Sequence, residues 1–345
     1  MPFITHQDEL WVSLLSEVKY DLYHLPEFTS LEAELLHGIA LAWYHEKGSN
    51  KVLIPLVKRK IANQPVYDLQ SPYGYPGMIS SEALNTNEAR KIFSCFHQEA
   101  KQEGYVSSFI RLNPLNNSWH FNTNRTNDDT PVFRQWFHGG TISVDLTGKP
   151  SSIRAAFSLN HKRNIKRLVS LGFEVQINHF EFLEAFRLAY RQTMKRREAN
   201  PYYFFPDSYF EHLKQLCNEK LIFISITDSD GNFVSGGLFT FFHEIIQYHL
   251  GATINTCVQL SPSKLMVDAA IDFGLSHKAN LLHLGGGIGG SNADGLFRFK
   301  KGFGYQYHAY STLRFIHDDT AYNELKSLKC KKFDNPDYFP EYRMS

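Results

Sequence analysis

Apolar and polar positions along this chain form two blocks that follow one plan. In the first block the pattern predicts a helix over residues 9–18, strands over residues 38–45, 52–58 and 66–69, a helix over residues 87–103 and a strand over residues 105–112. In the second block it predicts helices over residues 181–197 and 207–220, strands over residues 221–226, 233–241 and 246–251, a helix over residues 260–277 and a strand over residues 280–284. We therefore predict an α/β (α+β) chain of two lobes, each a mixed, mostly antiparallel sheet flanked by helices, over residues 1–142 and 143–330, with a tail over residues 331–345.

Length and charge agree with two domains in one chain. At 345 residues the chain exceeds the usual single-domain size, and 43% hydrophobic residues can fill two cores. The 36 basic and 35 acidic side chains nearly cancel, giving a net charge of +1. This balance argues against a protein whose whole surface binds nucleic acid, so we expect no DNA partner, although a local basic groove remains open.

The cysteines and the N-terminus indicate the compartment. Cys95, Cys217, Cys257 and Cys330 are scattered, so their spacing indicates neither a disulfide framework nor a zinc site. We expect no metal and a reducing, cytoplasmic location. No basic start precedes an apolar core, and no stretch approaches ~20 apolar residues, so we expect neither export nor a membrane span. Peripheral contact with a membrane stays open.

The start of the predicted helix at residues 260–277 has the features of an anion site. Ser261 is a natural N-cap, Pro262 suits the first helical position, and the amides of Ser263 and Lys264 are then free to hold a phosphate. The alternative is an ordinary crossover helix that packs on a sheet. The glycines that follow, including Gly285 and Gly286, lack the context of a dinucleotide or Walker loop, so they indicate a turn or a close approach of substrate to the backbone.

Six segments of the chain follow one another in a characteristic order: SPYGYPG at 71–77, FIRLNP at 109–114, NHKRNIKR at 160–167, YRQTMKRREANPYYFF at 190–205, YHLGAT at 248–253 and LFRFKKGFG at 296–304. In this order they resemble the Fem family of non-ribosomal peptidyltransferases and its acyltransferase relatives in the GNAT superfamily. The resemblance spans most of the chain and implies twin GNAT-like lobes, with the acceptor on the first and an activated acyl donor on the second.

Two departures from the family pattern bear on the donor. The chain lacks the long charged helical hairpin that several peptidoglycan-bridge members insert into the second lobe, which argues against aminoacyl-tRNA. Residues 255–263 contain no glycine or basic residue, so the common GNAT phosphate loop is missing. Binding of coenzyme A therefore follows from the position of the helix, with Ser261, Ser263, Lys264, Gly285 and Gly286 as the expected contacts.

The resemblance also implies the reacting centre. Lys300 matches the lysine of its motif and is expected at the donor carbonyl, where its charge would stabilise the oxyanion. The alternative is a snorkelling lysine over an aromatic core. Tyr248 and His249 lie in the strand that faces the acyl end of the donor, and alternation sends one inward. His249 is a candidate base toward an acceptor ammonium, with a hydrogen-bonded core histidine as the alternative.

Three groups are candidates for binding the acceptor, and the first two also have a structural alternative. In NHKRNIKR, Lys162 and Arg163 lie on a basic helix face that either holds phosphates or is only solvated. The loop SPYGYPG and the strand end beside it supply Tyr73, Tyr75, Arg111 and Asn113, which either pack against sugar or peptide or only form a turn. A polar aromatic cluster after a helix supplies Arg196 and Tyr203.

These features predict an amide-forming acyltransferase. We expect acyl-CoA as the donor and, as the acceptor, an amine on a nucleotide- or lipid-linked amino sugar or another cell-envelope or polysaccharide precursor. Direct attack by the amine needs no enzyme nucleophile, which agrees with the absence of a nucleophile elbow. One alternative is a peptidyltransferase that uses aminoacyl-tRNA on a peptidoglycan precursor. Another is a non-catalytic glycan-binding module.

Overall fold

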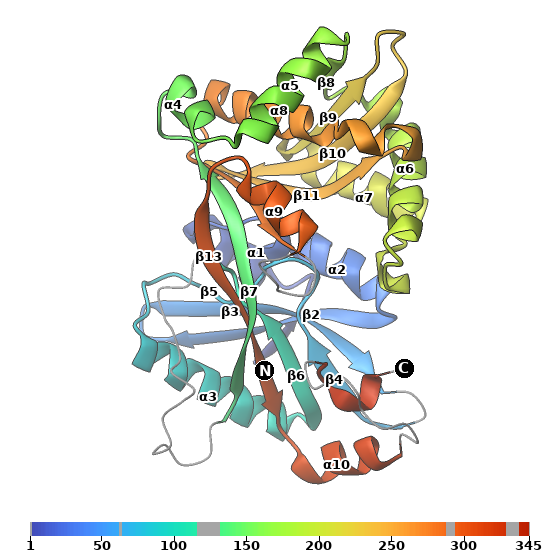
Figure 1. Ribbon diagram of the computed structural model, residues 1–345. Coiled ribbons are helices and arrows are strands. Elements are labelled where there is room, and N and C mark those ends of the chain that lie inside the picture. Colours follow the sequence, from blue (N-terminus) through green and yellow to red (C-terminus); the bar gives the residue numbers. More distant parts are fainter. Residues whose placement is uncertain (1, 62–63, 116–131, 288–293, 329–337, 345) are drawn as a thin grey trace. The chain divides into compact units, whose positions relative to one another are not determined.

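The chain forms two compact units in the computed structural model, which describes residues 2–61, 64–115, 132–287, 294–328 and 338–344 (Figure 1). Unit 1 contains residues 1–138 and 309–345, and unit 2 contains residues 139–308. Residues 309–330, which the sequence pattern assigns to the second lobe, belong to unit 1. The reason is strand pairing, because β13 (Gln306–Ile316) pairs antiparallel with β6 (Tyr105–Arg111).

Unit 1 is a mixed sheet with helices on both faces. Its helices are α1 (Glu9–Glu17), α2 (Pro26–Leu35), α3 (Thr86–Gln102) and α10 (Asp319–Ser327). Its strands lie in the order β1 (Phe3–Thr5), β2 (Gly38–Lys47), β3 (Asn50–Lys60), β4 (Tyr67–Gln70), β6 and β13, with β5 (Ile79–Ser80) paired to β3. Strands β4 and β6 pair parallel across the α3 crossover, and the neighbouring pairs are antiparallel.

Alternation along the long hairpin of β2 and β3 explains the two layers of unit 1. Trp43 and Ile54 belong to the core beneath α3, whereas Ala42 and Leu53 belong to the cluster beneath α1. The Asn85 side chain caps α3 by accepting from the amides of Asn87 and Glu88, and the Glu88 carboxylate accepts from the Asn85 amide. The sequence therefore determines both the faces of the sheet and the start of its longest flanking helix.

Unit 2 has the same kind of architecture. Its helices are α4 (Pro150–Ala155), α5 (Leu159–Ser170), α6 (Leu183–Arg196), α7 (Asp207–Cys217), α8 (Ser263–Ser276) and α9 (Gly295–Lys301). Its strands lie in the order β7 (Arg134–Asp145), which begins in unit 1, then β12 (Leu281–Gly286), β11 (Ile245–Thr253), β10 (Phe233–Phe242), β9 (Leu221–Thr227) and β8 (Glu174–Ile177). Strands β11 and β12 pair parallel, and their neighbours pair antiparallel.

The two faces of the unit 2 sheet carry different helices. Ile224, Ile246 and Leu282 pack in the core formed with α8 and α5. Phe223 points to the other face, where its ring lies 5.5 Å from that of Phe186 in α6. These faces decide which of the predicted site residues can meet.

The predicted fold class is confirmed, since each unit combines a mixed sheet with flanking helices. The pattern did not predict α2, β7 or β13, although β7 and β13 are strands of 12 and 11 residues. Half of each of these strands is exposed or only partly buried, so their hydrophobic signal is diluted.

Candidate functional site

Strands β11 and β12 separate inside unit 2. Their parallel ladder contains Ile245, Ile246 and Gln247, and its last pair is Gln247 with His283. Beyond that pair, β11 continues along β10, and β12 continues along β7 up to Gly286. The separation leaves backbone groups of two adjacent strands outside their shared ladder, which is the arrangement that allows a ligand to approach a sheet.

Lys300 of α9 lies at this separation. Its side chain is buried, with 7% of the residue exposed, and Nζ donates to the carbonyl oxygen of Gly286 at 2.5 Å. Nζ is also 5.9 Å from the centroid of the Tyr248 ring. Burial lowers the pKa of Lys300 to about 7, against the opposing effect of Asp294. The structure thus brings Lys300 and Tyr248, both predicted at the acyl end of the donor, together with Gly286, a predicted contact of coenzyme A.

Tyr248 is held in place by a glycine and a stacked ring. Its ring lies 4.8 Å from that of Phe239 on the neighbouring strand. A Cβ at position 251 would lie 1.7 Å from the Tyr248 hydroxyl oxygen, so only glycine fits there. Burial raises the pKa of Tyr248, so the hydroxyl keeps its proton and can donate a hydrogen bond.

His249 points to the opposite face and does not meet Lys300. Its Nε2 lies 2.9 Å from the hydroxyl of Tyr209 in α7. Burial lowers the pKa of His249 to about 3, so the imidazole is neutral at physiological pH. This environment favours the hydrogen-bonded core histidine over the base toward the acceptor. The physical reason is the alternation of β11, which can send only one of Tyr248 and His249 toward α9.

His283 is a buried polar residue that the sequence pattern missed. It is 1% exposed, and its Nδ1 lies 2.6 Å from Gln247 Oε1 across the last pair of the parallel ladder. Burial lowers its pKa well below the ordinary value, with smaller effects of His308 and Lys300. A neutral imidazole therefore lies within electrostatic range of Lys300. The signal in the sequence was a histidine between two leucines of a strand.

The start of α8 differs from the expected capped terminus. Ser261 has a left-handed backbone with φ of 53° and ends the short helical turn Asn255–Leu260, so its side chain does not cap α8. The N-cap position is Pro262, without a side-chain hydrogen bond. The Lys264 amide already donates to the Ser261 carbonyl at 3.1 Å. Of the two predicted amides, that of Ser263 is the one left for an anion among the described contacts.

Lys264 turns toward α5. Its side chain is buried at 8% exposure, burial lowers its pKa, and Nζ donates to Asn160 Oδ1 at 2.7 Å. Asn164 of the same helix donates to the Leu260 carbonyl at 2.9 Å. His161 Nε2 lies 2.9 Å from the Phe299 carbonyl of α9. The segment NHKRNIKR therefore joins the start of α8 to α9, the two elements expected to hold the donor.

The cations of α5 face outward, as the pattern predicted. Lys162 is exposed and donates to the Ala155 carbonyl at 2.7 Å, and Arg163 is exposed. Phe157 and Leu168 are buried on the other side of this segment. An exposed basic face is thus present in unit 2.

In unit 1 the segment SPYGYPG is fixed to the end of β6. Arg111 donates to the Ser71 carbonyl at 2.8 Å, its amide donates to Ser71 Oγ at 2.7 Å, and Gly77 donates to the Arg111 carbonyl at 2.8 Å. Gly74 has φ of 89°, and a Cβ there would lie 2.0 Å from the Tyr23 ring. Arg111 therefore holds this loop through the loop's own carbonyls.

Tyrosines and carboxylates gather around this loop. The Tyr75 ring lies 5.9 Å from that of Tyr23 and 5.2 Å from that of Tyr310, a residue of β13 that the sequence did not place here. Glu32 is fully buried and accepts from the Tyr73 amide at 3.1 Å. Burial raises the pKa of Tyr23, and Tyr73, Asp21, Tyr75 and Glu32 add to the shift.

Asn113 lies beside SPYGYPG in unit 1, where its Nδ2 donates to Asp21 Oδ2 at 3.5 Å and its backbone lies against Gly77, whereas Arg196 and Tyr203 lie in unit 2. Asn113 is 5% exposed and accepts from the Leu115 amide at 2.9 Å in unit 1. In unit 2, Arg196 donates to Asn255 and to Thr193 Oγ1, so it ties the end of α6 to the turn before α8. Tyr203 is 36% exposed, and its ring lies 5.2 Å from that of Tyr202.

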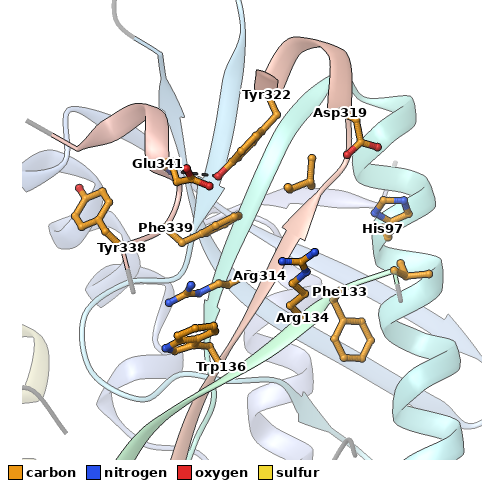
Figure 2. A pocket seen from close by; sticks show the side chains of 12 residues that line it. His97, Phe133, Arg134, Trp136, Arg314, Asp319, Tyr322, Tyr338, Phe339 and Glu341 are labelled. Carbon is orange, nitrogen blue, oxygen red and sulfur yellow. Dashed lines mark hydrogen bonds between the residues drawn. The ribbon is translucent and has the colours of Figure 1, made fainter. Parts of the chain in front are cut away.

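A pocket of about 470 Å³ lies in unit 1 (Figure 2). Arg314 fills part of it, with its guanidinium 4.3 Å from the Trp136 ring centroid and 5.7 Å from that of Phe339. The carboxylates that line the pocket are those of Asp319 and Glu341, and Glu341 forms an ion pair with Lys326. None of the predicted site residues lines this pocket.

Comparisons with known proteins agree with this architecture. No family model matches the chain, and no curated protein matches it in sequence. Among solved structures the chain is similar to FemX, with 15% identity, 94% of this chain and 99% of that one covered, and a TM-score of 0.67. It is similar to the C-terminal domain of a putative lysylphosphatidylglycerol synthetase from Agrobacterium fabrum, with 10% identity, 91% and 92% coverage and a TM-score of 0.55.

It is also similar to a tandem GNAT protein from the clavulanic acid biosynthesis pathway, with 10% identity, 92% and 98% coverage and a TM-score of 0.50. The chain thus has the fold of Fem-type and tandem GNAT proteins, as the sequence resemblance implied. Across the residues described, no helix has both the length and the apolarity that crossing a membrane requires.

Proposed function

We propose that the protein is an N-acyltransferase that forms an amide from an activated acyl donor and an amine. The observation that carries the proposal is the buried Lys300 at the separation of β11 and β12, in a chain with the tandem GNAT fold. A lysine whose pKa is about 7 is charged in a large fraction of molecules at neutral pH, and the charge lies in a site of low dielectric.

The donor we propose is acyl-CoA, held by unit 2. Its phosphates would lie near the Ser263 amide at the start of α8, and its thioester near Lys300, Tyr248 and Gly286. The amine nitrogen attacks the carbonyl carbon, the C–N bond forms, and the C–S bond breaks. The attacking nitrogen is the neutral amine, so a bound ammonium first releases one proton to water, and the second proton lost by nitrogen leaves with the thiol. Positioning and stabilisation of the oxyanion by Lys300 supply the rate, without an enzyme nucleophile.

We propose that the acceptor binds at the segment SPYGYPG of unit 1, residues 71–77, which we call the tyrosine loop. Asp21 is half-buried near Tyr23, and the fully buried Glu32 adds negative charge, so an ammonium group would meet a carboxylate beside aromatic rings. An amino sugar carried by a nucleotide or a lipid, as in envelope or polysaccharide precursors, presents such a group together with a ring that packs on tyrosine.

The exposed basic face of α5 favours a second donor, aminoacyl-tRNA, in a transfer to a peptidoglycan precursor. Lys162, Arg163, Lys166 and Arg167 are all exposed there and suit phosphates. The helices that the structure describes in unit 2 are at most 14 residues long, so in that part of the chain a long helical arm for tRNA is not seen.

A comparison of donors tests the proposal. Purified protein receives isotope-labelled acetyl-CoA or aminoacyl-tRNA, each with free amino sugars, nucleotide-linked amino sugars and muropeptides as acceptors. Label in an amide from acetyl-CoA supports the proposal. Label from tRNA alone replaces the donor, and binding of glycan without transfer from either donor would support a non-catalytic module.

A further inference from the structure

A histidine, a cysteine and a glutamate that the proposed function does not use converge in unit 1. His45 lies on β2, and Cys95 and Glu99 lie one helical turn apart on α3. Cys95 Sγ is 3.9 Å from His45 Nδ1 and 3.8 Å from Glu99 Oε1. One ligand atom of each residue lies within 4.8 Å of the others, and all three side chains are half-buried.

We propose that His45, Cys95 and Glu99 bind a Zn²⁺ ion. Imidazole, thiolate and carboxylate are the ligand types of zinc, and tetrahedral bonds of about 2.0–2.3 Å place neighbouring ligand atoms about 3.4–3.7 Å apart. The two measured separations from the sulfur are within a few tenths of an ångström of this range. The third separation, between the imidazole nitrogen and the carboxylate oxygen, is at most 4.8 Å, so these two side chains must rotate toward each other for an ion to reach all three atoms.

The surroundings of the cluster orient two of the three ligands. Trp43 Nε1 donates to Glu99 Oε2 at 2.5 Å, which leaves Oε1 directed at the sulfur. The Trp43 ring also stacks on His45, with centroids 5.2 Å apart and planes 9° from parallel. Trp43 is fully buried, so it fixes both groups from inside the unit. Support of this kind from outside the ligand set is typical of metal sites.

The number of protein ligands predicts the form of the site. Three protein ligands leave the fourth position of a tetrahedral zinc to water, which half-buried side chains allow. The ion would join α3 to β2 and thereby stabilise unit 1, because a ligand that binds only the folded state raises its stability. No local motif indicates this site, because His45 precedes Cys95 by 50 positions and the next cysteine along the chain is Cys217.

Cobalt substitution tests the site directly. Untagged, metal-free protein is titrated with Co²⁺, and we expect a thiolate-to-cobalt charge-transfer band that saturates at one ion per chain and disappears when Zn²⁺ is added. Cys95→Ser should lose the band. Cys257→Ser removes a half-buried cysteine of unit 2 and should keep it. Glu99→Gln retains the acceptor for Trp43 and should weaken Zn²⁺ binding by at least ~10-fold.

Two controls keep the test decisive. Zn²⁺ should raise the melting temperature of the wild-type chain and leave that of Cys95→Ser unchanged. If Cys95→Ser does not fold, alkylation of the wild-type chain replaces it, and Zn²⁺ should slow the modification of Cys95 but not of Cys257. Absence of the band, a band that persists in Cys95→Ser, or equal alkylation with and without Zn²⁺ would each overturn the proposal.

Discussion

Lys300 is the residue on which the proposed chemistry depends. Because its pKa is about 7, its charged and neutral forms are both populated near neutral pH. Its side chain is buried, and Nζ bonds to the Gly286 carbonyl where β11 and β12 separate. Lys301, its neighbour, is exposed and lies over the Tyr305 ring at 4.6 Å. The two lysines therefore differ in environment while sharing a helix, which makes Lys301 a matched control.

We expect Lys300→Met to lower kcat by about 100- to 1,000-fold, because loss of one preorganised oxyanion partner costs roughly that much. The KM for the acceptor should change little, since the side chain lies in unit 2. Steady-state kinetics of Lys300→Met and of the control Lys301→Met measure kcat and KM, and we expect Lys301→Met to react at nearly the wild-type rate. Equal losses in the two variants would contradict a role of Lys300 at the carbonyl.

The depressed pKa of Lys300 also predicts how stability depends on pH. Its folded pKa is about 7 and its ordinary value is 10.5, so between these pH values the unfolded chain binds a proton that the folded chain does not. The unfolding free energy contributed by this residue should therefore rise with pH across that window and level off below about pH 7, where both states are protonated. Urea unfolding of the wild type and of Lys300→Met measures it, and identical pH profiles would refute the shift.

At the scale of elements, α5 is the connector of the proposed donor site. Asn160→Ala removes the acceptor of the buried Lys264 ammonium, and a bond to a charged group contributes about 1.5–3 kcal/mol. We expect a loss of about 1–3 kcal/mol in urea unfolding. Lys162→Ala changes an exposed residue of the same helix and should stay within about 0.5 kcal/mol. If Asn160→Ala also lowers the unfolding free energy by no more than about 0.5 kcal/mol, then the bond between α5 and Lys264 does not stabilise the proposed donor site.

The tyrosine loop of unit 1 depends on Gly74 for two separate reasons. Alanine there suffers from a φ of 89° and from a Cβ only 2.0 Å from the Tyr23 ring. Gly104 has a φ of 76° with nothing within 4 Å of its Cβ position, so Gly104→Ala reports backbone strain alone. We expect Gly104→Ala to cost about 1 kcal/mol and Gly74→Ala at least 1 kcal/mol more, by chemical denaturation. Equal costs would mean that Tyr23 does not fix this loop.

At the scale of the whole molecule, the spacing of hydrophobic residues and the turn residues between them were enough to predict the central strands and helices of both units. The hairpin of β2 and β3 and the helices α3 and α8 appeared within a few residues of their predicted bounds, because their buried faces repeat at strand or helix spacing. Strand β13 was missed, so the return of the chain to unit 1 was missed with it. That return supplies Tyr310 to the loop, a contact across 235 positions from Tyr75.

The site was predictable only in part. The lysine of its motif and the strand with Tyr248 could be located from the resemblance, since both depend on local sequence. The side to which His249 points, the left-handed Ser261 and the bond between Lys264 and Asn160 depend on partners far along the chain. Burial by distant elements, which no local pattern contains, also sets the pKa of Lys300.

Hydrogen exchange with and without acetyl-CoA tests the central claim, that unit 2 holds the donor where β11 and β12 separate. We predict that the ligand slows exchange at the start of α8, at the end of β12 and in α9, and that Lys300→Met weakens the effect at the end of β12 and in α9. Protection confined to unit 1, or no protection in α8 and α9 at saturating ligand, would contradict it.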